Sequence, residues 1–155
     1  MNGPAYRRLT WDEVQPGQRL PPARDQLDVG RVVASAAATW TFFGGHTDAD
    51  YARSVQGRDH VYLATGPILG LLDRYVTSWA GPEAFLAKRS VRMVDSLYAG
   101  DDLRFGGVVT RTWVDDTRGY RRALVEIDVQ IRNGTDAACV LATVCYQLPQ
   151  DDASG

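Results

Sequence analysis

One stretch of the sequence carries a clear helical stripe of apolar residues. The stripe comprises Ile68, Leu71, Leu72, Tyr75, Val76 and Trp79, and this spacing predicts an amphipathic helix. Proline has no N–H and suits the first helical position, so we expect the helix to begin at Pro67. Gly81 and Pro82 are typical of its end. Gly70 is a poor helix former, which predicts close approach of a ligand or of another backbone.

Downstream of this helix the pattern changes to a period of two. Val125, Ile127, Val129 and Ile131 alternate with polar residues, which predicts a strand with one buried and one solvated face. Further strands are expected over residues 85–94, 103–114 and 138–148. Gly106 and Gly107 predict a bulge or bend, and Asn133–Gly134 predicts a hairpin turn. The combination predicts an α+β fold in which an antiparallel sheet wraps around one helix.

The region before the helix is less regular. Residues 1–25 carry four of the seven prolines and are expected to form an extended lead-in on the surface. Residues 29–33 favour a short strand, residues 34–43 a short helix that ends at Gly44–Gly45, and residues 46–52 a turn followed by one helical turn. The whole chain of 155 residues is expected to be one domain, with a disordered tail over residues 150–155.

Composition excludes several classes of function. The formal net charge is −2 and there is no basic block, which argues against nucleic acid and anionic membranes as partners. No apolar run approaches the ~20 residues of a membrane helix, and the first residues lack a signal-peptide core. Cys139 and Cys145 fall on one expected strand, roughly 20 Å apart, too far for a disulfide. The chain is therefore expected to be cytoplasmic, with reduced thiols. No zinc spacing or phosphate loop occurs, and no metal or cofactor is predicted.

Several short motifs occur in a recognisable order. They are the lead-in Trp11–Pro22, His46-x-Asp48-x-x-Tyr51-Ala52, the segment Ala64-Thr65-Gly66-Pro67-Ile68, and the turn Tyr98-Ala99-Gly100-Asp101-Asp102-Leu103. Together they resemble the MaoC-like hydratases and dehydratases, which have the hotdog fold. The run Arg74–Pro82 is similar to an actinobacterial branch of that family that includes steroid side-chain enoyl-CoA hydratase subunits.

The resemblance implies addition of water to a trans-2-enoyl thioester, or the reverse dehydration. In the family an Asp, and a His five residues later, hold the water and handle its protons. Here His46 matches the histidine, but Thr41 stands where the Asp is expected. A threonine hydroxyl does not ionise usefully, so the acid/base pair is incomplete. Asp48, Asp50, Asp59 and His60 are candidate substitutes.

The resemblance also implies a set of site residues. His46 is the expected acid/base, Thr41 would position the reacting oxygen, and the Gly66 N–H at the helix start would stabilise the developing enolate. Expected substrate contacts are Phe42, Phe43, Tyr62, Thr65 and Asp48. Structural roles are the alternative: His46 on the surface, Asp48 as an N-cap, Thr41 as an ordinary helix residue, and Gly66 as a helix start. The residue types of Trp40, Phe42, Phe43, Tyr62 and Trp79 favour core positions.

Three functions remain open at this stage. The first is a dehydratase or hydratase, working as a homodimer on an acyl-CoA, a carrier-protein thioester or a polyketide-type intermediate. The second is a retasked natural-product cyclase that needs one base. The third is a non-catalytic subunit of a heteromeric enoyl-CoA hydratase, in which the partner carries the complete pair.

Overall fold

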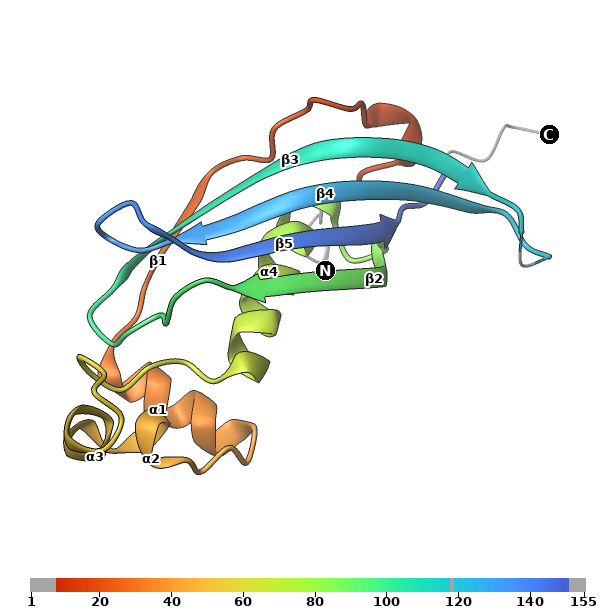
Figure 1. The fold of residues 1–155 in the computed structure, drawn as a ribbon. Helices are drawn as coiled ribbons and strands as arrows, with labels where there is room; N and C mark the ends of the chain where they lie inside the picture. The colour runs from red at the N-terminus through yellow and green to blue at the C-terminus, as the bar shows by residue number, and fades with distance from the viewer. Residues whose placement is uncertain (1–7, 118, 151–155) are drawn as a thin grey trace, which may run out of the picture.

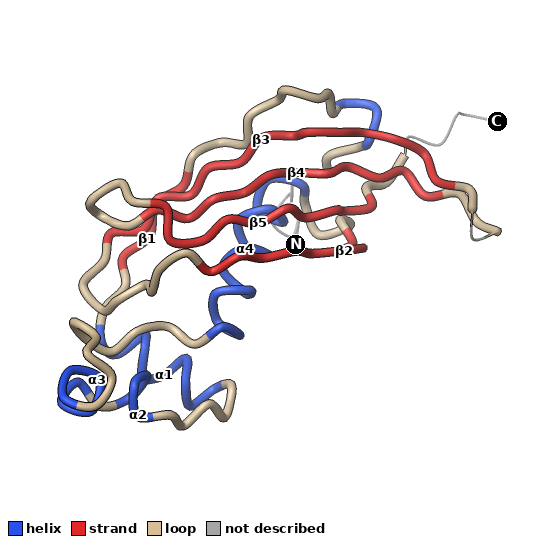
Figure 2. The backbone as a smooth tube through the Cα atoms, viewed as in Figure 1, coloured by secondary structure: helices blue, strands red, loops and turns tan. Residues whose placement is uncertain are grey.

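A five-stranded antiparallel sheet curves around one long helix (Figure 1). The computed structural model describes residues 8–117 and 119–150. Its helices are η1 (Trp11–Glu13), α1 (Val29–Ala38), α2 (Gly44–Thr47), α3 (Ala49–Ser54) and α4 (Thr65–Ala80). Its strands are β1 (Ala23–Gln26), β2 (Phe85–Met93), β3 (Asp102–Asp115), β4 (Arg122–Arg132) and β5 (Ala138–Gln147). Figure 2 shows the three short helices gathered beyond one end of the sheet, next to the start of α4.

The strand order is β1-β3-β4-β5-β2, with β1 and β2 at the edges of the described sheet. The predicted turn at Asn133 joins β4 to β5, and the Asn133 side chain accepts hydrogen bonds from the backbone N–H groups of Thr135 and Ala137. The expected bulge is displaced. Gly106 and Gly107 pair in regular register with β4, whereas the irregularity lies between Val109 and Arg111.

The core forms where the apolar stripe of α4 meets the inward face of β4. Leu72 and Val76 of α4 are fully buried, as are Val125 and Ile127 of β4, so both predicted periodicities are confirmed. Gly107 permits the close contact between these layers, because a Cβ there would lie 3.4 Å from Cε1 of Tyr75. Cys139 and Cys145 are buried, and neither forms a disulfide.

The expectations for the region before α4 need correction. Residues 29–33 are helical and open α1, where the Asp28 side chain caps the helix by accepting from the Arg31 N–H at 2.7 Å. The three valines at positions 29, 32 and 33 favoured a strand, but the Asp28 cap and the burial of Val32 and Ala36 decide for a helix. Part of the lead-in is a strand, since β1 pairs with β3 from Ala23 to Gln26. Residues 1–7 and 151–155 lie outside the described residues.

Helix α1 ends earlier than expected, in a tight reversal at Trp40. The Trp40 N–H donates to Ala37 O at 3.1 Å and the Thr41 N–H donates to Ala36 O at 2.8 Å, which is the Schellman pattern. Trp40 takes the left-handed position of this motif with φ 54°, where glycine is usual. The side chain of Trp40 is 84% exposed, that of Phe42 65% and that of Phe43 41%, so the core assignment of these three was wrong. That of Trp79 is confirmed.

Helix α4 begins two residues before the expected position. Thr65 is its first residue and Pro67 its third, still within the turn whose N–H groups have no helical partner. Gly70 is exposed, and a Cβ there would meet nothing within 4 Å. The predicted close approach at Gly70 therefore does not occur within the described chain. No helix among the described residues is long and apolar enough to cross a membrane.

Candidate functional site

His46 is held in one orientation by a backbone carbonyl. Its Nδ1 lies 2.8 Å from Tyr62 O, and its residue is 8% exposed. A carbonyl oxygen only accepts, so Nδ1 carries the proton in this hydrogen bond. In the neutral ring, Nε2 then has the free lone pair. The described structure therefore presents a buried imidazole whose second nitrogen is available as a base.

Two glycines allow His46 to sit so close to its neighbours. A Cβ on Gly44 would lie 2.5 Å from the ring of Tyr51, and a Cβ on Gly45 would lie 2.8 Å from the Tyr62 hydroxyl. A real Cβ essentially never comes within 3.0 Å of another heavy atom that is not bonded to it, so any other residue at these positions would force α2 or the two tyrosines to shift. The His46 ring packs edge-on against Tyr62, with 4.9 Å between centroids, and against Phe43 at 5.6 Å.

The segment that receives His46 is itself anchored to the sheet end. Tyr62 forms an isolated bridge with Tyr98, and Leu63 N donates to Leu97 O at 2.9 Å. The Tyr98 turn is closed by Asp101, whose carboxylate accepts from the Tyr98 N–H at 2.8 Å. Burial raises the pKa of Asp101. This turn was recognised in the sequence, and its contact with the His46 segment is a result of the tertiary structure.

Thr41 reaches the start of α4 through a residue that the sequence analysis did not single out. Its Oγ1 lies 3.0 Å from Thr39 Oγ1. The Thr39 methyl group in turn lies 3.7 Å from the position that a Cβ on Gly66 would occupy. The pattern Thr39-x-Thr41 was the only signal in the sequence that could have indicated this contact.

The start of α4 offers unpaired backbone donors. Its N-cap is Ala64, which has no capping side chain. Within the described residues no acceptor is bound to the N–H groups of Thr65 and Gly66, and both residues are exposed. Pro67 has no N–H. The partial positive charge of this helix end therefore faces outward on two free N–H groups.

The remaining candidates have other roles in the described chain. Asp48 is the N-cap of α3, with its side chain accepting from the N–H groups of Asp50 and Tyr51, which confirms the capping prediction. His60 Nδ1 accepts from the Val61 N–H at 2.8 Å. Asp50 pairs with Arg53 at the surface, with a side chain that is 98% exposed. Asp59 is also exposed. No group of three or more metal-ligating side chains occurs among residues 8–117 and 119–150.

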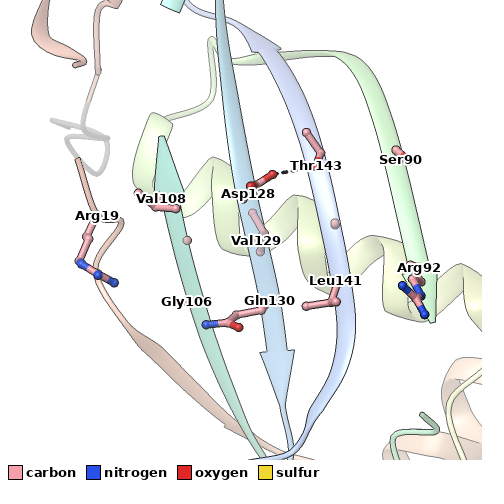
Figure 3. Close-up of a pocket in the computed structure, with 12 residues that line it drawn as sticks. Arg19, Ser90, Arg92, Gly106, Val108, Asp128, Val129, Gln130, Leu141 and Thr143 are labelled. Carbon is pink, nitrogen blue, oxygen red and sulfur yellow. Dashed lines mark hydrogen bonds between the residues drawn. The ribbon is translucent and has the colours of Figure 1, made fainter. Parts of the chain in front are cut away.

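A hollow lies on the opposite side of the sheet from α4. It has a volume of about 490 Å³ and lies on the outer face, where Gly106, Gln130, Leu141 and Arg92 form one row across four strands (Figure 3). The missing side chain of Gly106 creates part of this space. None of the residues expected in the site lines it, so we keep the candidate site at His46 and the start of α4.

Comparisons with known proteins give a consistent assignment. No family model matches the sequence. The chain is 36% identical over 94 residues to the 3-oxo-4,17-pregnadiene-20-carboxyl-CoA hydratase beta subunit of Mycobacterium tuberculosis. This match covers 61% of this chain and 72% of that protein. A chain in the crystal structure of the ChsH1–ChsH2 complex from the same organism is 32% identical, with a TM-score of 0.75, and the match covers 86% of this chain and 98% of that one.

A third comparison extends the fold assignment. The R-hydratase PhaJ1 from Pseudomonas aeruginosa superposes with a TM-score of 0.80 at 16% identity, over 93% of this chain and 88% of that one, which shows a shared hotdog fold. The chain belongs to the MaoC-like hydratases and dehydratases of the hotdog fold, near the steroid side-chain enoyl-CoA hydratase subunits.

Proposed function

We propose that this chain adds water to the double bond of an α,β-unsaturated acyl-CoA, as one subunit of a heteromeric hydratase. The substrate we propose is a steroid acyl-CoA of the kind in the relative's name, 3-oxo-4,17-pregnadiene-20-carboxyl-CoA. The observation that carries the proposal is the 2.8 Å contact between His46 Nδ1 and Tyr62 O. This hydrogen bond leaves Nε2 as the base, and Tyr62 belongs to the segment that leads into α4.

The site has one base and one neutral acceptor. A water molecule has two hydrogens, of which one would bond to His46 Nε2 and the other to Thr41 Oγ1. Both lone pairs of the water then remain free for the substrate. Thr41 would orient the water without taking its proton, so the missing carboxylate lowers the rate without removing the base.

The reaction then needs only His46 for proton transfer. The water oxygen bonds to the β-carbon while His46 Nε2 takes one water proton, and the π electrons of the double bond move to the thioester oxygen. The Thr65 and Gly66 N–H groups stabilise that enolate. As the enolate carbonyl reforms, the α-carbon takes the proton from His46, which returns to its neutral form. The product is the 3-hydroxyacyl thioester.

A second subunit would complete the site. In the single chain Trp40, Phe42, Thr65 and Gly66 are exposed, so the start of α4 is open on one side. An apolar acyl group would be excluded from water only when another surface covers these residues. We therefore place Phe42, Phe43, Tyr62 and Thr65 in the substrate wall and assign the missing side to a partner subunit. A second copy of this chain is the alternative partner.

The test is the hydration rate of His46→Gln with 3-oxo-4,17-pregnadiene-20-carboxyl-CoA, measured for the chain alone and for its complex with a co-produced second hotdog subunit. We expect a fall of about 100- to 10,000-fold, because a positioned acid/base is lost. His60→Gln is the matched control, because within the described residues the His60 side chain bonds its neighbour Val61, and the rate of this variant should be unchanged. An unaltered rate in His46→Gln would assign the chemistry to the partner.

A further inference from the structure

Thr39 connects three parts of the candidate site. It is the C-cap of α1, and its Oγ1 lies 2.8 Å from Ser35 O and 3.0 Å from Thr41 Oγ1. Its methyl group lies 3.7 Å from the place of a Cβ on Gly66. One side chain thus bonds the end of α1 and the threonine of the incomplete pair, and it lies near Gly66 at the start of α4.

The hydrogen bonds of the two threonines determine which atom donates. A hydroxyl has one proton. The shortest contact of Thr39 Oγ1 is with Ser35 O, which can only accept, so the Thr39 proton is used there. Thr41 Oγ1 has two acceptors in reach, Thr39 Oγ1 at 3.0 Å and Thr39 O at 3.2 Å. The nearer acceptor is Thr39 Oγ1, and we assign the Thr41 proton to it. Thr39 O, a backbone atom that every variant at position 39 retains, is the more distant alternative.

This arrangement makes Thr41 an acceptor toward the site. With its proton directed back to Thr39, the lone pairs of Thr41 Oγ1 are left for a water or hydroxyl group. A carboxylate at the same position would also offer only acceptors. The hydroxyl thus retains the hydrogen-bonding part of the role of Asp and loses only the charge and the basicity.

The backbone enforces the meeting of the two hydroxyls. Trp40 lies between them in the left-handed conformation, with φ 54°, and the Thr41 N–H returns to Ala36 O at 2.8 Å. A left-handed conformation is unfavourable for an L-residue that carries a Cβ, so the reversal is retained against a local preference. It brings residues 39 and 41 to the same side of the end of α1.

We propose that Thr39 is a positioning residue that fixes the Thr41 hydroxyl as a hydrogen-bond acceptor for the reacting water. The proposal rests on the proposed function, because it gives Thr41 a part in holding that water. Thr39 itself does not touch the substrate in this assignment. Its hydroxyl acts through Thr41, and its methyl group lies against the first turn of α4.

The kinetic test is a double-mutant cycle on the co-produced complex, with 3-oxo-4,17-pregnadiene-20-carboxyl-CoA as substrate. Thr39→Val keeps the shape and removes the hydroxyl, and we expect kcat to fall roughly three- to tenfold, the value of one neutral hydrogen bond. Thr39→Ser should restore the wild-type kcat. Thr39→Val should have no further effect in a Thr41→Val background. Independent, multiplying losses in the double variant would overturn the proposal.

A second measurement does not depend on activity. Three-bond couplings between the Thr41 methyl carbon and its backbone nitrogen and carbonyl carbon report the χ1 rotamer. We expect one rotamer in the wild type and in Thr39→Ser, and averaging between rotamers in Thr39→Val. A single unchanged rotamer in Thr39→Val would contradict the proposal. If Thr39→Val kept a single rotamer while His46→Gln lost activity, the proposed function would be supported and the positioning role of Thr39 would be rejected.

Discussion

The sheet with α4 and the group of short helices α1, α2 and α3 are stabilised in different ways. In the first region, residues such as Leu72, Val76 and Ile127 are fully buried between layers. In the second, the helices are 10, 4 and 6 residues long, too short to be stable alone, and Trp40 and Phe42 are largely exposed. Side-chain caps at Asp28 and Asp48 supplement the limited burial of α1 and α3. His46 lies in α2, and Thr41 lies in the connection between α1 and α2. Burial of apolar side chains stabilises the sheet with α4, whereas hydrogen bonds position the residues of the candidate site.

One carboxylate links the two regions. Asp25 of β1 accepts hydrogen bonds from Arg31 of α1, at 2.6 and 3.0 Å, and from Arg74 of α4. These bonds, the one from Arg31 first, hold the pKa of Asp25 well below its ordinary value. Asp25 thus links α1 to the central helix α4 through charged hydrogen bonds.

The largest expected effect on stability is in the core between the sheet and α4. Leu72→Ala leaves a cavity at a site with no exposed surface, so the free energy of unfolding should fall by about 2–5 kcal/mol. Urea unfolding followed by circular dichroism measures it. Leu141→Ala, on the outer face and 39% exposed, is the control and should change stability by less than about 0.5 kcal/mol. Equal losses in the two variants would contradict the assignment of the core.

A smaller effect is expected at the link between the regions. Asp25→Asn should lower the free energy of unfolding by about 1–2 kcal/mol at pH 7, because hydrogen bonds to two guanidinium groups lose their charged acceptor. The pKa of Asp25 is lower in the folded state, so the stabilisation is complete above its ordinary value of 3.8 and is lost as the pH falls through the folded value.

The pH dependence provides the check on this link. The stability difference between wild type and Asp25→Asn should be constant from pH 5 to pH 7 and should shrink below about pH 4. Amide hydrogen exchange should increase in α1 more than in β4. A difference that grew on acidification would have the wrong sign and would exclude this role of Asp25.

The smallest expected effect is a gain in stability at Trp40. Trp40→Gly relieves a left-handed residue, for which glycine has no Cβ penalty, and the expected increase in the free energy of unfolding is about 0.5 kcal/mol after the added freedom of the unfolded chain is subtracted. The urea midpoint measures it. Trp40→Ala removes the ring but keeps the Cβ, so it should show no such gain. A gain of the same size in Trp40→Ala would assign the effect to the exposed ring.

The sheet and α4 could be predicted from the sequence because their apolar residues recur at a regular spacing. The α4 stripe and the alternation in β4 each report a face buried against another layer. The start of α4 and the bulge near Val109 were displaced, and the close approach expected at Gly70 does not occur within the described chain. The region before α4 has no such signal. Residues 29–33 favour a strand by composition, and the Asp28 cap together with packing of Val32 makes them helical. The aromatic residues 40, 42 and 43 were expected in the core because residue type alone does not report exposure.

By itself the sequence determined the helix-and-sheet pattern, the motif order that indicates the family, and the presence of His46 with Thr41 in place of an Asp, since these depend only on residue identity and spacing. Only the tertiary structure decided that His46 bonds Tyr62 O, that Thr39 lies between Thr41 and Gly66, and that Asp25 joins β1, α1 and α4. Each of these contacts joins segments whose approach is set by packing of the whole chain, and no local pattern encodes a hydrogen bond to a distant backbone carbonyl.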